Sequence, residues 1–197
     1  MKKYIIIIAF CFFGLSNSNA QVSFKPGLRG GLNFSHLTQT DNSNERFSNK
    51  TDFYIGFYGA LNLSKVYTMQ PELNYSRQGS KYEYIDGDNV HHHGQIDLSY
   101  LSIGMANKFN FDKFNIHVGP TIDIRVNDRK KRLGEVYDED YFDDDFSGID
   151  LAFFFGAGYK FTENFGVDAR IKKGIIPVDD SWDYTNVVFQ TGINYTF

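Results

Sequence analysis

The sequence contains very few of the residues that build covalent or thiolate sites. Its 197 residues include one cysteine, Cys11, four prolines and one tryptophan. Because Cys11 lies in an N-terminal segment that we expect to be removed, the mature chain is predicted to have no disulfide, no thiolate metal site and no cysteine nucleophile. The net charge of −4 and the lack of a basic stripe argue against a nucleic-acid partner.

Long hydrophobic runs are also missing, apart from one at the N-terminus. There, an apolar run from Tyr4 to Leu15 follows two lysines, and small residues stand at Ser18 and Ala20. This is the pattern of a cleaved signal peptide, and the run is too short to span a membrane as a helix. We therefore predict a signal peptide at 1–20, export through it, and one mature domain at 21–197.

The chain is rich in aromatic residues, with 20 phenylalanines and 13 tyrosines. Large apolar side chains alternate with small or polar ones in eight runs, and a period of two is the signal of a β-strand. The runs are Phe24 to Phe34, Phe53 to Leu63, Tyr67 to Tyr75, Ile96 to Phe109, Phe114 to Val126, Ile149 to Phe161, Phe165 to Ile171 and Val187 to Phe197. The phase of the fourth run slips near Tyr100, which indicates a β-bulge.

The connections between the runs alternate in length. Short links at 64–66, 110–113 and 162–164 alternate with long ones at 35–51, 78–95, 127–148 and 174–186. Outer-membrane barrels combine short periplasmic turns with long extracellular loops in this way. We therefore predict an all-β fold, an eight-stranded antiparallel up-and-down transmembrane β-barrel with both termini on the periplasmic side.

The two faces of the predicted strands differ in charge. Large apolar residues line one face, and ten charged residues fall on the other: Lys25, Arg29, Glu72, Lys108, Asp123, Arg125, Asp150, Lys160, Asp168 and Arg170. A sandwich core does not hold so many ions, because an unpaired buried ion costs several kcal/mol or more. We predict that they form a paired charge network inside the barrel, while the apolar face meets lipid and aromatic residues at the strand ends form girdles.

Three prolines, Pro26, Pro71 and Pro120, lie inside the predicted strands. A proline lacks the N–H that a central strand needs, so these positions count against a regular ladder. We expect bulges or strand ends at these points.

Several short motifs, taken in order, are similar to one known family. They include Gly27-Leu28-Arg29-Gly30-Gly31-Leu32-Asn33, Gln70-Pro71-Glu72-Leu73-Asn74-Tyr75, Gly156-Ala157-Gly158-Tyr159, Asp168-Ala169-Arg170 and the terminal Tyr195-Thr196-Phe197. In these the chain resembles the Bacteroidota outer-membrane β-barrel family often called PorT-like. The resemblance implies a barrel in the outer membrane. The named member serves protein secretion, so a secretion role would be an analogy only.

Two polar segments of the predicted outer loops are candidate metal sites. His91, His92 and His93 carry imidazoles that suit zinc, copper or nickel, but adjacent histidines in an extended segment point to alternating sides. The acidic stretch 135–145 follows the basic stretch 129–132, and its carboxylates suit calcium. Its spacing does not match an EF-hand loop. We interpret both segments as solvated loops, with the basic and acidic stretches pairing with each other, and we expect no metal or cofactor.

The interior charges also admit a catalytic interpretation. Asp123 and Asp168 are candidates for paired acid–base carboxylates, and His117 with Asp123 for activating a serine or threonine. No G-x-S-x-G motif supports a nucleophile. Since buried charges must be paired whatever their function, we favour a structural network.

We therefore expect a monomeric, non-enzymatic outer-membrane barrel with a binding, scaffold or envelope-structural role through its extracellular loops. Its partners would be the lipid bilayer and other envelope or secretion proteins. The alternatives are a component of a secretion system, a membrane-embedded lipid-modifying enzyme and a soluble lipocalin-like carrier. A wide pore is disfavoured, because porins need about 16 strands.

Overall fold

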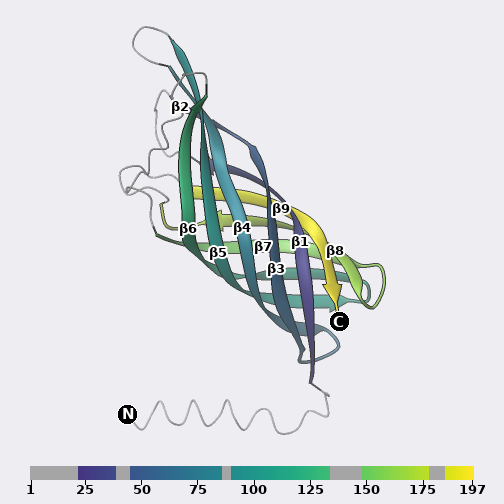
Figure 1. The fold of residues 1–197 in the computed structure, drawn as a ribbon. Coiled ribbons are helices and arrows are strands. Elements are labelled where there is room, and N and C mark those ends of the chain that lie inside the picture. Colours follow the sequence, from purple (N-terminus) through teal and green to yellow (C-terminus); the bar gives the residue numbers. More distant parts are fainter. Residues whose placement is uncertain (1–21, 39–44, 86–89, 134–147, 178–184) are drawn as a thin grey trace, which may run out of the picture.

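The structure is a computed structural model that describes residues 22–38, 45–85, 90–133, 148–177 and 185–197 (Figure 1). The predicted signal peptide at 1–20 lies outside these residues. The described part of the chain forms nine strands: β1 Ser23–Thr38, β2 Glu45–Ser48, β3 Lys50–Asn62, β4 Tyr67–Ile85, β5 His91–Phe111, β6 Phe114–Leu133, β7 Ile149–Lys160, β8 Phe165–Gly174 and β9 Thr185–Thr196. No helix among the described residues is long and apolar enough to cross a membrane.

The strands form one antiparallel sheet that closes on itself. Its order is β2-β4-β3-β1-β9-β8-β7-β6-β5, and an additional pairing of β4 with β5 closes the ring. β2 continues the line of β3 and also pairs with β4, so the closed wall contains eight strands. The predicted eight-stranded up-and-down barrel is therefore confirmed. Both described ends, Val22 and Phe197, lie on the side of the short turns (Figure 1).

The outer surface of the barrel is apolar. Outward-facing Leu73, Ile103 and Phe155 are among the exposed large hydrophobic residues, which occur on all eight strands of the wall. Aromatic pairs lie at both ends of this surface. Near the short turns are Tyr67–Phe109, Tyr159–Phe161, Phe165–Tyr195 and Tyr195–Phe197, and toward the other end are Phe34–Phe189 and Phe53–Tyr75. The nine residues from Tyr67 to Tyr75 fit the roughly 9–11 residues that a tilted strand needs to cross the hydrocarbon core of a membrane.

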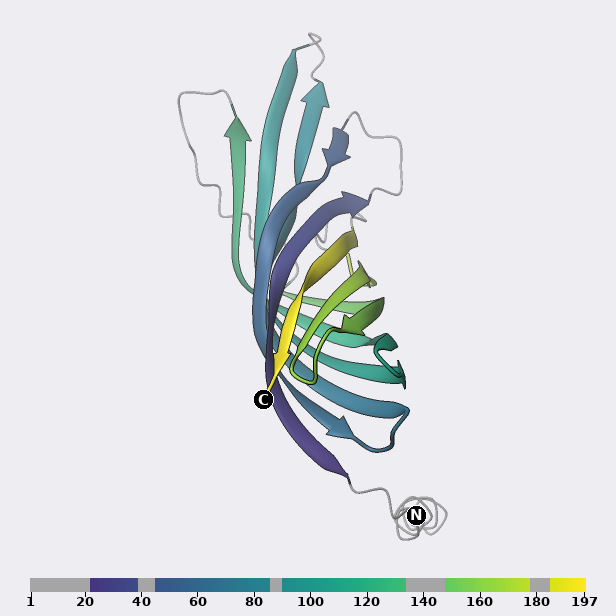
Figure 2. The ribbon, with the colours of Figure 1, turned by 90° about the vertical axis from the view of Figure 1, so that its right-hand side faces the viewer.

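Three strands continue well beyond the apolar surface, on the side away from the termini. β4 and β5 remain paired as far as Ile85 and His91, and β6 runs to Leu133 beside β5 (Figure 2). The prediction that 78–95 and 127–148 are loops was therefore wrong for most of the first segment and for the start of the second. The outward residues there are Arg77, Lys81 and Glu83. Because they are charged and not apolar, the sequence did not predict a membrane strand in this segment.

The β-bulge predicted near Tyr100 is present, but the extra residue lies in β6. Ser99 pairs with Asn127 and Tyr100 with Arg125, which leaves Val126 as the extra residue. The phase of β5 does not slip. Its even-numbered residues face inward throughout, and those above the bulge are apolar instead of polar.

Local breaks in the ladders accommodate two of the strand prolines. Pairing of β3 with β4 is interrupted opposite Pro71, and pairing of β5 with β6 is interrupted opposite Pro120. Pro26 lies one residue beyond the point where β9 begins to pair with β1. Each proline therefore sits where a neighbouring strand does not require its missing N–H.

Candidate functional site

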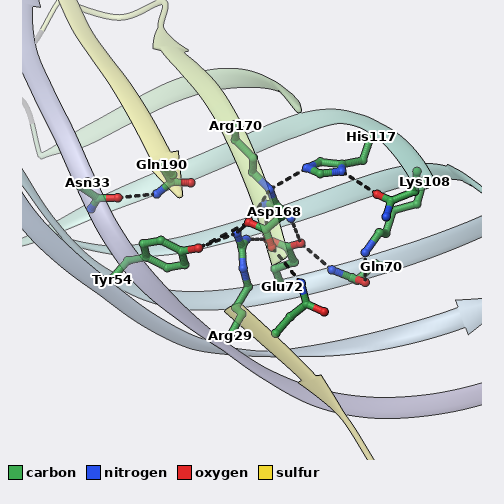
Figure 3. Close-up of polar contacts among 12 residues, drawn as sticks. Arg29, Asn33, Tyr54, Gln70, Glu72, Lys108, His117, Asp168, Arg170 and Gln190 are labelled. Atoms are coloured by element: carbon green, nitrogen blue, oxygen red, sulfur yellow. Dashed lines mark hydrogen bonds and ion pairs between the residues drawn. The ribbon is translucent and has the colours of Figure 1, made fainter. Parts of the chain in front are cut away.

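A network of charged and polar side chains crosses the inside of the barrel (Figure 3). β1 contributes Arg29, β4 contributes Glu72, and β8 contributes Asp168 and Arg170. All four are buried. They point inward because each lies on the face opposite the apolar residues of its strand, and alternation fixes that choice for the whole strand.

Glu72 is the centre of this network. Its Oε2 and Oε1 accept hydrogen bonds from Arg170 Nη1 and Nη2 at 2.7 and 2.8 Å, a bidentate arrangement. Arg29 also donates to Oε2, and Gln70 Nε2 donates to Oε1 at 2.8 Å. Lys108 Nζ donates in turn to the side-chain oxygen of Gln70 at 3.3 Å. One carboxylate thus joins two guanidinium groups and anchors a neighbouring amide.

Asp168 supplies the second negative charge. Its Oδ2 lies 3.0 Å from Arg29 Nη2, and its Oδ1 accepts a hydrogen bond from Asn194 Nδ2 at 3.2 Å. The ring of Tyr54 lies beside the Arg29 guanidinium, which is 4.9 Å from its centroid. The positive charges of the two arginines equal the negative charges of the two carboxylates. Such neutralisation is needed because a buried, unpaired charge is costly.

His117 completes the network and fixes its own tautomer. Arg170 Nε can only donate, so His117 Nε2 accepts that hydrogen bond at 2.9 Å. His117 Nδ1 therefore carries the proton and donates to Asn115 Oδ1 at 3.0 Å. The ring of Phe154 covers the other side of Arg170, 4.6 Å from its guanidinium carbon. The imidazole is committed to holding Arg170 in place.

Two smaller ionic groups lie closer to the extended end. Lys172 pairs with Asp123, and Gln78 Nε2 lies 3.5 Å from the same Asp123 oxygen. Lys50 pairs with Asp52 and also with Asp97, at 2.6 Å. Residues 50–53 of β3 are not paired with β4. Near this gap, Lys50 Nζ donates a hydrogen bond to the backbone carbonyl of Gln78 at 3.3 Å.

The ten charged residues predicted for the interior are not all buried in the structure. Arg29, Glu72, Asp123, Asp150, Asp168 and Arg170 are buried, whereas Lys108 and Arg125 are half-buried. Lys25 and Lys160 are exposed, so the structure corrects their placement. Both stand near strand ends on the side of the short turns, where the wall no longer encloses them.

The sequence pattern missed several members of these groups. Lys172 continues the inward series of Asp168 and Arg170, and alternation places it on that face, but it lies one residue beyond the predicted run and was not included in the predicted charge network. Lys50 falls in a segment that was predicted to be a loop. Tyr54 is uncharged, so only its place on the inward face of its strand connected it with the network.

The contacts of the described side chains do not bring together the catalytic pairs considered from the sequence. His117 contacts Arg170 and Asn115, whereas Asp123 contacts Lys172 and Gln78. Asp168 belongs to the Arg29 cluster rather than to Asp123. No group of three or more His, Cys, Asp or Glu side chains in the described ranges is arranged to hold a metal ion.

The histidine run lies in β5 rather than in a loop, which corrects its predicted setting. His91 Nδ1 contacts Glu83 Oε1 at 2.6 Å, and the pKa of Glu83 is lowered by this hydrogen bond. His91 and His93 are exposed, and His92 is half-buried. The neighbours therefore point to alternating sides, as expected. The acidic stretch 135–145 lies outside the described residues.

The extended strands enclose a small hydrophobic core of their own, the outer core. Leu37, Ile96, Leu98 and Tyr100 are buried together, with Phe47 and Tyr82 packed against them. These residues come from β1, β2, β4 and β5, so the outer core ties the strand extensions to the mouth of the barrel. The extension is a packed structure beyond the apolar surface, not a set of separate loops.

Comparison with known proteins gives a consistent result. The outer membrane protein beta-barrel domain family matches residues 19–180. The crystal structure of Neisserial surface protein A is similar, with a TM-score of 0.53 at 12% identity over 87% of this chain and 97% of that one. The attachment invasion locus protein Ail of Yersinia pestis has a TM-score of 0.49 at 11% identity, over 88% of this chain and 98% of that one. No curated protein matches the sequence.

Proposed function

Because the chain belongs to the outer membrane protein beta-barrel domain family, we propose that it is a non-enzymatic integral protein of the outer membrane. In this proposal the barrel is a closed, non-conducting anchor. The extended strands β2, β4, β5 and β6 form an extracellular surface that binds or scaffolds other envelope components. The mature protein starts after a cleaved signal peptide and is a monomer, since its wall is closed without a partner.

The filled interior is the observation that carries this proposal. Arg29, Glu72 and Arg170 meet across the inside of the barrel, and Phe154 and His117 pack beside them. An eight-stranded barrel has room for little more than its own side chains. Passage of a solute would require breaking buried ion pairs, which supports an anchor rather than a pore.

The outer core supports a role for the extension. A sheet that only closed a barrel would not need strands that continue for ten residues past Tyr75 with apolar packing of their own, from Tyr75 to Ile85. At ~3.3 Å per residue this adds ~33 Å of strand. Such a rigid projection suits contacts at some distance from the bilayer.

The distribution of apolar and charged side chains over the two faces of the barrel wall argues against a soluble carrier. A lipocalin-like protein needs an apolar interior and a polar exterior, whereas Ile55, Ile103 and Phe155 face outward here and the ionic network faces inward. A lipid-modifying enzyme would need a nucleophile and a base, and the imidazole of His117 is already held between Arg170 and Asn115.

Two measurements test the proposal, one on purified protein and one in cells. The refolded protein in liposomes should cause no swelling with small sugars, and a swelling rate like that of a porin would contradict the closed anchor. In cells, a variant in which residues 82–94 are replaced by Asn-Gly should still fold and insert, because Lys81 and Gln95 are directly paired.

This shortened hairpin separates the binding role from the barrel. Envelope proteins or surface polymers that cross-link to the full-length protein should be lost from the shortened variant, while its amount in the outer membrane stays the same. Cross-linked partners that are retained in full would contradict a role for the extension. Impaired protein export in the shortened variant would identify the scaffold as part of a secretion system.

A further inference from the structure

The outer face of β4 changes from apolar to basic where the strand leaves the lipid-facing surface. Tyr75 ends the outward apolar series, and Arg77 and Lys81 follow on the same face, with Gly79 between them. The guanidinium carbon of Arg77 lies 6.0 Å from the ring centre of Phe53, which pairs with Tyr75 at this end of the apolar surface. Arg77 therefore lies at the level of the aromatic girdle, where lipid tails give way to headgroups.

Neither basic side chain is fully engaged by the protein. Arg77 Nε lies 3.4 Å from Asp52 Oδ1, and the two terminal nitrogens of Arg77 contact no carboxylate among the described residues. The Arg77 side chain is 37% exposed. Lys81 is exposed, and the described part of the chain gives its ammonium group no ion pair. Both groups can therefore donate hydrogen bonds to a ligand on the outside of the wall.

Acidic and basic side chains differ in exposure beyond the girdle. Among the side chains that the structure describes there, the exposed lysine and arginine residues are Arg46, Lys81, Arg129 and Lys173. The aspartate and glutamate residues are half-buried, and each lies against a basic group of the protein: Asp52 and Asp97 against Lys50, Glu83 against His91, and Asp128 against Arg125. The surface left to the surroundings is therefore basic and fits an anionic partner.

The opposite end of the barrel does not separate the two signs of charge in this way. In the short turns, Asp112 and Lys113 are both exposed, and so are Lys65 and Glu163. The basic surface thus belongs to the end that carries the extension. In the proposed orientation this end meets the outer leaflet, whose phosphorylated glycolipid, lipid A, is anionic and attracts basic groups next to the bilayer.

We propose that Arg77 and Lys81 bind a phosphate group of lipid A at the outer edge of the barrel wall. A guanidinium donates two parallel hydrogen bonds to phosphate oxygens, and an ammonium group adds a second positive charge. Below Arg77, the exposed side chains of Ile55 and Leu73 continue the surface downward, and the acyl chains of the same lipid would lie on them. This inference rests on the proposed outward orientation of the extension and names one envelope component that it binds.

Native mass spectrometry of the refolded full-length protein in a neutral detergent tests the site, with lipid A as the probe. Wild type should retain one lipid A molecule, and lipid A without its phosphates should bind at least ~tenfold more weakly. Arg77→Gln and Lys81→Gln should each weaken binding ~fivefold, the usual effect of one basic group near an anionic lipid surface. Lys113→Gln is the matched control, because it removes an exposed lysine at the opposite end of the barrel and should bind like wild type.

Both variants should fold, as checked by migration on unheated gels. In Arg77→Gln, Asp52 keeps its ion pair with Lys50, and Lys81→Gln changes an exposed side chain. Three results would overturn the site: the same lipid A affinity in both variants as in wild type, an equal loss in Lys113→Gln, or equal binding of lipid A with and without phosphates. Equally tight binding of inorganic phosphate would also overturn it, because the site would then take free phosphate in place of a lipid.

Two further variants separate this site from its alternatives. The shortened hairpin retains Arg77 and Lys81, so it should bind lipid A like wild type while it loses its cross-linked partners, and the two proposals can therefore fail independently. Wild type should bind lipid A with the acidic stretch 135–145 intact. Binding seen only after the carboxylates of that stretch are replaced by amides would overturn the site, because the stretch would then occupy the two basic groups in the native protein.

Discussion

Replacement of Glu72 by glutamine changes one charge at the centre of the interior network and almost nothing in shape. In the native protein the two Glu72 oxygens accept hydrogen bonds from Arg29, Arg170 and Gln70. A glutamine keeps one acceptor oxygen and turns an N–H₂ toward a guanidinium. Arg29 and Arg170 would then share the single charge of Asp168, so the buried cluster would carry a net positive charge.

The size of the effect follows from burial. Glu72 is 4% exposed, so little water can compensate the unpaired guanidinium. Removing one partner of a buried ion pair typically costs ~3–5 kcal/mol of unfolding free energy. We expect Glu72→Gln to lose about 3 kcal/mol or more, and the double variant Glu72→Gln with Arg170→Gln to lose less than the single one, because the double variant restores neutrality.

Urea unfolding of the refolded barrel in lipid vesicles measures these differences, with folding checked by migration on unheated gels. Glu163→Gln is the control, since Glu163 is exposed in the β7–β8 turn and should change stability by less than ~0.5 kcal/mol. A loss below ~1 kcal/mol for Glu72→Gln would refute the buried, mutually neutralised network.

Three further changes test other parts of the structure. Leu73→Arg places a charge on the lipid-facing side and should destabilise the barrel by ~2–4 kcal/mol, whereas Lys81→Gln, higher on the same strand, should be nearly neutral in the same unfolding assay. Gly79→Ala should cost at least ~1 kcal/mol, because Gly79 has a φ of 133° and its added Cβ would collide with a backbone carbonyl of β5. The pKa of Glu83 is lowered by its hydrogen bond to His91, so His91→Ala should raise the Glu83 pKa toward its usual value in an NMR titration. Since the folded pKa is the depressed one, the small stabilisation from this pair is present above the ordinary glutamate range and is lost as the pH falls through the folded pKa. An unchanged Glu83 pKa in the variant would contradict the contact.

Alternation was enough to predict the barrel because lipid on one side and enclosed ions on the other impose a strict period of two. The start of β7 shows this directly, since Ile149, Leu151, Phe153 and Phe155 are large and exposed while the residues between them are buried. The extension escaped prediction because beyond Tyr75 both faces of the sheet meet water or the outer core. Arg77 and Lys81 then replace apolar residues on the outer face, and Ile96 and Leu98 appear on the inner one.

The partners within the network were harder to predict than its members. Sequence alone places Glu72 and Arg170 on inward faces but does not give the register that brings β4 and β8, separated by 98 residues, to one point. The same limit hid the ion pair between Asp123 in β6 and Lys172 in β8, because the sequence does not show that these two side chains meet inside the barrel. Register also depends on the bulge at Val126, which the sequence pattern indicated near Tyr100, on the strand opposite, and not in β6 itself.

Two adjacent phenylalanines allow the orientation of the wall to be measured directly. In β7, Phe154 is 2% exposed and lies against Arg170, whereas Phe155 is 60% exposed on the outer surface. Phe155→Trp and Phe154→Trp, each in a Trp182→Phe background, would be reconstituted in vesicles with brominated lipid. Fluorescence at position 155 should be strongly quenched and fluorescence at position 154 only weakly. Equal quenching, or the reverse order, would contradict a barrel with lipid outside and paired charges within.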